Sequence, residues 1–260
     1  MAYESGEVIV TGVMIVTVIL VLIFTIRMLV RGKRSMTCVY FAFAIVSMLL
    51  SEFYWLTYDI LRGDARMPFA ANEFAEMAMF LLLASSLRTV FTERIRIDAA
   101  FVLTFLYALG NVFLWVIWNG DWVEALLTAP AYIYYLVTVV FALCRSHALR
   151  RGELVMIACL AFSSLLLQYA EYLFPSAHNV LGLSNYILLF TSLGVWAFLL
   201  IRAFSAGKEP HILLALTFCT AAWAQNTMYM CAEWWYLAAE CLYVFTVPAM
   251  FFAVRREVAE

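Results

Sequence analysis

An arginine recurs at a nearly constant interval along this chain. Arg31, Arg88, Arg145 and Arg202 are each 57 positions apart, and Arg255 follows 53 positions later. Each of them ends a long apolar stretch and opens a short basic segment. A unit of this length fits two membrane-crossing helices of about 20 residues each, together with their two turns. The interval therefore predicts an all-α integral membrane protein built from pseudo-repeated helical hairpins of about 57 residues.

The composition agrees with a chain that is buried in a bilayer. Hydrophobic residues make up 66% of it and charged residues 13%, against roughly 45–50% and 25% in soluble domains. The mean hydropathy is +0.93. Only 10 Gly and 5 Pro occur in 260 residues, so long linkers are absent. We therefore expect residues 1–260 to form a single transmembrane domain.

The apolar stretches and the turn residues between them divide the chain into spans. We expect nine spans, at about 8–30, 36–61, 70–91, 97–118, 122–144, 153–174, 181–204, 211–230 and 232–254. One long or re-entrant segment across Met230 and Cys231 would leave eight. The corresponding units are an N-terminal anchor helix at 8–31 and four hairpins at 36–91, 97–145, 153–204 and 211–256.

Charge is distributed unevenly between the two ends of these spans. With nine spans, 14 of the 16 Lys and Arg lie on one side, and only Arg62 and Arg66 lie on the other. Basic loops stay in the cytoplasm, so we expect a multi-pass protein of the cell membrane with its N-terminus outside and its C-terminus cytoplasmic. The first span follows Glu4 and Glu7 rather than basic residues, which is the reverse of a secretory signal peptide.

A second register of polar residues accompanies the arginines. Glu52, Asn111, Gln168 and Gln225 are separated by 59, 57 and 57 positions, at comparable depth in the second, fourth, sixth and eighth spans. Internal duplication explains this spacing, and transporters are often built from such repeats. Helical hairpins of similar length would also look periodic without duplication.

Some of the acidic residues have a structural explanation. Four of them fall in the first turn of a predicted helix, where the positive end of the helix dipole stabilises a carboxylate and where side chains cap backbone amides. These are Glu73, Asp121, Glu124 and Glu233.

Other acids lie too deep for capping. A carboxylate in hydrocarbon is costly, so it usually faces the bundle interior or a watery cavity. The deep acids are Glu52, Glu76, Glu171 and Glu240. An acid, an aromatic residue and an acid at i, i+3 and i+7 share one helical face, and this arrangement occurs twice, as Glu52–Trp55–Asp59 and as Glu233–Tyr236–Glu240.

Acids beside aromatic rings indicate cation binding. The carboxylate supplies the charge and the ring face adds cation–π attraction. An interfacial belt of Trp and Tyr would explain many of the rings, but it does not explain the acids on the same faces. We therefore expect an outward-facing cavity that binds a small cationic ligand, with candidate ligand-binding residues Glu52, Trp55, Glu76, Glu171, Tyr236 and Glu240.

Other chemistries have no support in the sequence. The three histidines, His147, His178 and His211, do not pair within a span, and the six cysteines form no C-x-x-C pair. There is no phosphate-binding glycine loop and no nucleophile elbow. We therefore expect no enzymatic activity, no cofactor, no bound metal and no nucleic-acid partner.

Three classes of function fit these features. A small transporter or permease for a cation or protonated molecule, with proton coupling through Glu52 or Glu240 left open, fits the repeats and the deep acids best. A membrane sensory module that binds a ligand and signals to a cytoplasmic partner is the alternative, as is a non-catalytic subunit of a larger membrane complex. Besides membrane lipids, a homo-oligomeric copy or a partner membrane subunit remains open.

Overall fold

The computed structural model describes residues 2–32, 35–61, 71–119 and 122–259. The regular secondary structure of this part of the chain is all helical, as predicted, with nine α-helices, one short 3-10 helix (η1, Pro175–Ala177) and no strand. The α-helices are α1 (Ala2–Arg31), α2 (Met36–Leu61), α3 (Ala71–Val90), α4 (Ala99–Asn119), α5 (Trp122–Arg145), α6 (Arg151–Leu173), α7 (His178–Ser205), α8 (Pro210–Tyr229) and α9 (Glu233–Ala259).

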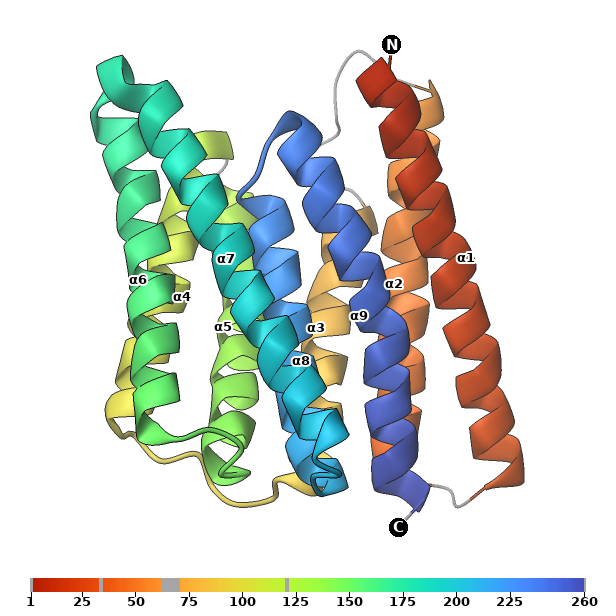
Figure 1. The fold of residues 1–260 in the computed structure, drawn as a ribbon. Helices are drawn as coiled ribbons and strands as arrows, with labels where there is room; N and C mark the ends of the chain where they lie inside the picture. Colours follow the sequence, from red (N-terminus) through yellow and green to blue (C-terminus); the bar gives the residue numbers. More distant parts are fainter. Residues whose placement is uncertain (1, 33–34, 62–70, 120–121, 260) are drawn as a thin grey trace.

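Consecutive helices run in opposite directions, so the two termini lie at opposite ends of the bundle (Figure 1). Each expected hairpin is a pair of packed helices: α2 with α3, α4 with α5, α6 with α7, and α8 with α9. α8 ends at Tyr229 and α9 begins at Glu233. The last two apolar stretches are therefore two separate helices, while the number of spans stays a prediction.

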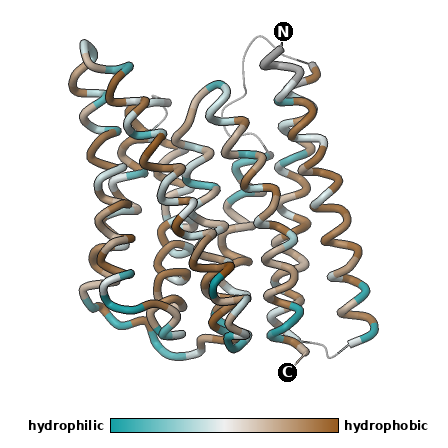
Figure 2. Tube along the Cα trace, in the orientation of Figure 1, coloured by the Kyte–Doolittle hydropathy of each residue, from teal (hydrophilic) through white to brown (hydrophobic). Residues whose placement is uncertain are grey.

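The periodic arginines all lie at the end of the bundle that carries the C-terminus. Arg31, Arg88, Arg145 and Arg202 are in the last turns of α1, α3, α5 and α7. A cation there interacts favourably with the negative end of the helix dipole. Arg202 also forms an ion pair with Glu153, at 2.8 Å between Nη2 and Oε1. Hydrophilic segments gather at this end in Figure 2, whereas the helix middles are apolar.

Seven helices in the described part of the chain are long and apolar enough to cross a membrane. This indicates a multi-pass membrane protein. The two α-helices outside that set are α3 and α8, both of which we expected to be spans. α8 is less apolar because it does not face lipid: it packs against α3, α5, α7 and α9, and every residue from Leu213 to Thr227 is buried.

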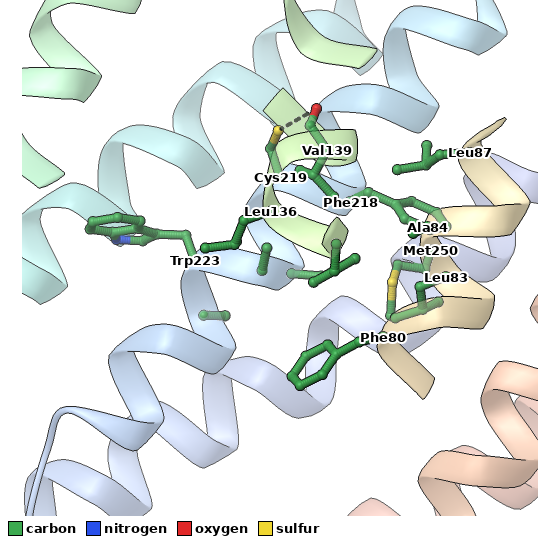
Figure 3. Close-up of a cluster of buried hydrophobic side chains, with 14 of the residues drawn as sticks. Phe80, Leu83, Ala84, Leu87, Leu136, Val139, Phe218, Cys219, Trp223 and Met250 are labelled. Carbon is green, nitrogen blue, oxygen red and sulfur yellow. Dashed lines mark hydrogen bonds between the residues drawn. The ribbon is translucent and has the colours of Figure 1, made fainter. Parts of the chain in front are cut away.

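The hydrophobic core is built around α8. Phe218 of α8 lies among Phe80 and Leu83 of α3 and Met250 of α9 in the buried cluster shown in Figure 3. The thiol of Cys219 donates to the backbone carbonyl of Val139 on α5, at 3.7 Å. Because protein surrounds α8 on all sides, its polar residues meet other protein groups rather than lipid tails.

The polar residues of the second register point into the bundle. Asn111, Gln168 and Gln225 are buried, with exposed fractions of 1%, 2% and 5%, and Glu52 is half-buried. The amide of Asn111 donates to the carbonyl of Tyr107 at 2.9 Å. These positions satisfy one requirement of a duplicated fold. Superposition of the hairpins stays a prediction.

Two of the predicted capping acids, Glu73 and Glu233, do lie in the first turns of α3 and α9. Asp121 lies outside the described residues, and so do the side chains of Glu124 and Asp59.

Candidate functional site

A cavity of about 470 Å³ lies between α1, α2, α3, α8 and α9, toward the end of the bundle that carries the N-terminus. Five of the six predicted ligand-binding residues line it: Glu52, Trp55, Glu76, Tyr236 and Glu240. We call it the acidic cavity. The other lining residues are Glu7, Thr11, Met14, Met48, Ser51, Met79, Gln225, Met228, Tyr229, Cys231, Ala232, Glu233 and Tyr243.

Five of the described residues that line the acidic cavity are glutamates. No described lining residue is Lys, Arg or His. Arg62 and Arg66, the basic residues expected at this end, lie outside the described residues. Low-dielectric walls that carry one sign of charge raise the local concentration of the opposite ion.

Helix geometry places the predicted residues on the cavity wall. Glu52 and Trp55 are three positions apart on α2, and Tyr236 and Glu240 are four positions apart on α9, so each pair shares one helical face. The indole of Trp55 makes edge-to-face contacts with the ring of Tyr58, with centroids 5.9 Å apart. This contact restricts the orientation of the indole at the cavity wall.

Glu76 is oriented by hydrogen bonds from two neighbouring helices. The hydroxyl of Ser51 on α2 donates to its Oε1 at 3.3 Å, and the hydroxyl of Tyr229 on α8 donates to its Oε2 at 3.1 Å. The amide of Gln225 donates to the Tyr229 oxygen at 3.0 Å. These hydrogen bonds hold both oxygens of the Glu76 carboxylate at the cavity wall.

Glu240 is the most buried of the predicted acids that line the cavity, with 5% of the residue exposed. The hydroxyl of Thr11 on α1 lies 3.5 Å from its Oε1, so the contact is long for a hydrogen bond. Burial of a carboxylate is costly unless hydrogen bonds or charges compensate for the lost water. A glutamate held at this depth on a cavity wall is a candidate for function.

Glu171 does not lie on the wall of the acidic cavity, where we expected it. It lines a neighbouring surface pocket of about 710 Å³, formed mainly by the α6–α7 corner and the α8–α9 turn. Its Oε1 is 3.2 Å from Nδ1 of His178, which begins α7. α6 packs against α4 and α7 rather than against α1, α2 or α3. Glu171 therefore has the expected depth but stands on the other side of the α8–α9 turn.

Several lining residues were not among the predicted site residues. Tyr229 and Gln225 could have been recognised because they stand one turn apart at the depth of Glu52. Glu233 was assigned to helix capping, and it both occupies the first turn of α9 and lines the cavity. Four methionines on the wall have no sequence signal, because methionine also fills gaps in ordinary cores.

No group of three or more His, Cys, Asp and Glu in the described residues has an arrangement that could hold a metal ion. The volume of the acidic cavity is instead within the range of small-molecule sites, about 300–1,000 Å³. No protein-family model, curated protein or solved structure matches this chain.

Proposed function

We propose that this chain is a small transporter or permease of the cell membrane that takes a cation or a protonated small molecule into the acidic cavity. The observation that carries the proposal is the lining itself: five glutamates and four aromatic residues around a cavity of about 470 Å³. Carboxylates supply attraction for a cation, and Trp and Tyr rings add cation–π contacts. No catalytic or cofactor role is proposed.

The orientation follows from the distribution of charge along the bundle. The periodic arginines lie at one end, and the acidic cavity lies toward the other end, with the N-terminus. Since basic segments face the cytoplasm, the cavity faces outward and the C-terminus is cytoplasmic. A ligand would enter from the outside.

Transport requires a second state in which the cavity opens inward. Below the cavity, toward the arginine end, the core around Phe218 and Met250 is closely packed. Pro248 lies within α9, eight positions after Glu240. Because proline removes one backbone hydrogen bond of the helix, it provides a bending point between the deepest acid and the closed end.

The same packed core favours a second candidate, a ligand-binding sensory protein. A sensor needs an outer site and a rigid connection to its cytoplasmic end, and it needs no path through the core. Uptake of a labelled amine into proteoliposomes distinguishes the two candidates, because a sensor would bind the amine without transporting it. A proton flux in the direction opposite to the amine would in addition identify proton coupling.

A matched pair of buried glutamates tests the cation site. Glu240 and Glu73 are 5% and 4% exposed, and only Glu240 lines the cavity. We expect E240Q to weaken binding of labelled phenylethylammonium to the purified protein by at least tenfold, which corresponds to about 1.4 kcal/mol. E73Q should change it less than twofold.

Both variants should insert and purify like the unchanged protein, which size-exclusion chromatography can verify. Equal effects of E240Q and E73Q, with both proteins intact, would show that the acids are structural. The cation site would then have to be abandoned.

A further inference from the structure

A pocket of about 450 Å³ lies between α1 and α9 at the basic end of the bundle, far from the acidic cavity. These two helices pack against each other and run in the same direction (Figure 1), so both bring their last turns to this pocket. We call it the arginine pocket. The described residues that line it are Phe24, Arg27, Met28, Arg31, Gly32, Phe251 and Arg255.

Three of these lining residues are arginines, and no described lining residue is acidic. Arg27, Arg31 and Arg255 are all exposed, so a ligand can reach their guanidinium groups. Within the described part of the chain, none of the three forms an ion pair with a carboxylate. Glu257, two positions after Arg255 on α9, does not line the pocket.

The arginines of this pocket differ from other members of the periodic series. Arg145 and Arg202 each form an ion pair with a glutamate at the same end of the bundle. Arg31 and Arg255 are the first and last members of the series, and they meet at the arginine pocket without such a partner. The positive-inside rule accounts for basic residues at this end, but it does not account for their convergence on one pocket.

An apolar layer lies deeper in the membrane than the arginines. The rings of Phe24 and Phe251 have centroids 6.1 Å apart, so they stand at the same depth. Arg27 and Arg31 follow Phe24 by three and seven positions, and Arg255 follows Phe251 by four, which places the arginines about 5–10 Å closer to the end of the bundle. Phe24 is 49% exposed, so the apolar layer is open to the acyl chains of the surrounding leaflet.

We infer that the arginine pocket binds an anionic phospholipid of the leaflet at this end, which is the cytoplasmic leaflet in the proposed orientation. The phosphate lies among Arg27, Arg31 and Arg255, and the first part of an acyl chain lies on Phe24. Guanidinium groups bind phosphate through two parallel hydrogen bonds, and basic pockets between helices on the cytoplasmic side suit lipid headgroups. A soluble phosphate would use the arginines alone, whereas a lipid uses both layers.

The test measures phospholipid binding to the protein in a neutral detergent, by native mass spectrometry. Phosphatidylglycerol should bind several-fold more tightly than phosphatidylcholine with the same acyl chains, because only the former carries a net negative charge. R31Q/R255Q should weaken binding of phosphatidylglycerol by about 25-fold, since each arginine near an anionic headgroup contributes a factor of about five.

R151Q/R256Q is the matched control, because it also removes two exposed arginines from the basic end of the bundle. Arg151 begins α6, Arg256 lies over the ring of Phe204, and neither lines the arginine pocket. The general attraction between the basic end and an anionic lipid falls equally in both double variants. R151Q/R256Q should therefore change binding of phosphatidylglycerol by less than about twofold.

Photocrosslinking locates the bound lipid on the unchanged protein. A phosphatidylglycerol with a diazirine near the top of one acyl chain should form adducts on α1 and α9, close to Phe24 and Phe251. Adducts spread evenly over the ends of all helices would refute a defined site. This experiment and the comparison of the two lipids need no variant, so they decide the question even if R31Q/R255Q does not purify.

Two further outcomes would overturn the inference. Equal losses in R31Q/R255Q and R151Q/R256Q would show that these arginines only orient the chain in the membrane. Displacement of phosphatidylglycerol by inorganic phosphate, but not by chloride at the same ionic strength, would show that the pocket binds a soluble phosphate. None of these measurements involves the acidic cavity, so their failure leaves the proposed cation site untouched.

Discussion

Replacing Gly182 by alanine tests how tightly α7 is fitted against Glu171. A Cβ at Gly182 would lie 2.9 Å from Oε1 of Glu171 and 3.3 Å from its Cδ. Ordinary van der Waals contact begins at 3.4 Å, so the carboxylate has to withdraw by about 0.5 Å. Its Oε1 is the atom that contacts Nδ1 of His178 at 3.2 Å, and a withdrawal directed away from His178 takes it beyond hydrogen-bonding distance.

Two contributions of similar size oppose each other in this variant. Alanine in place of glycine inside a helix stabilises by about 0.5–1 kcal/mol. Loss of the contact between Glu171 and His178 costs about 0.2–1 kcal/mol, toward the lower end because the His178 side chain is 65% exposed. The contact with the carboxylate adds a further cost. G182A alone should therefore be neutral or destabilising by up to about 1 kcal/mol.

A double-mutant cycle isolates the contact. In an E171A background the carboxylate is absent, so G182A should show only the stabilisation that alanine gives a helix relative to glycine, about 0.5–1 kcal/mol. The expected coupling between the two positions is about 0.5–2 kcal/mol, or roughly 1–8 °C in the unfolding temperature of a chain of this size. Thermal unfolding of the four purified proteins in the same detergent measures it. Additive effects, or a G182A gain that is equal in both backgrounds, would refute the close approach.

Two further predictions follow from the topology and from the hydrogen bonds at the cavity wall. A cysteine at position 179, at the start of α7, should react with an impermeant maleimide on intact cells, whereas a cysteine at position 208 should not. The reverse labelling would show that the protein has the opposite orientation. The related site at Asp64 lies outside the described residues. Y229F removes the hydroxyl that donates to Glu76 at 3.1 Å, which should destabilise the protein by about 1–3 kcal/mol in thermal unfolding, whereas Y172F, at an exposed tyrosine of α6, should change stability by less than about 0.5 kcal/mol.

The positions of the helices could be predicted because hydropathy and turn residues are local properties of the sequence. The second predicted span, 36–61, coincides with α2, and the fifth, 122–144, is one residue shorter than α5. The largest difference is at α1, which begins at Ala2 rather than near residue 8. Glu4 and Glu7 are polar residues in that helix, and a hydropathy pattern does not register a helix that continues beyond the apolar stretch.

The candidate site was predictable in depth but not in lateral position. The rise of 1.5 Å per residue gives the depth of each acid, and this brought Glu52 and Glu240 to one level. Which helices are neighbours depends on tertiary packing, and the sequence pattern does not contain it. Glu171 has the expected depth, but α6 packs against α4 and α7 and not against the helices that line the acidic cavity. The methionines that line the acidic cavity could not be predicted as site residues, because methionine also fills ordinary hydrophobic cores.

The burial of α8 from Leu213 to Thr227 also bears on how the chain is made. A segment that carries Gln225, Asn226 and several threonines has little tendency to enter lipid by itself, and its surroundings are α3, α5, α7 and α9. Of these, α9 is synthesised last. During biosynthesis α8 must therefore wait at the protein-conducting channel until α9 follows, or enter a gap that the first seven helices keep open. A nascent chain that stops after Tyr229 would lack α9 and would leave this side of α8 uncovered.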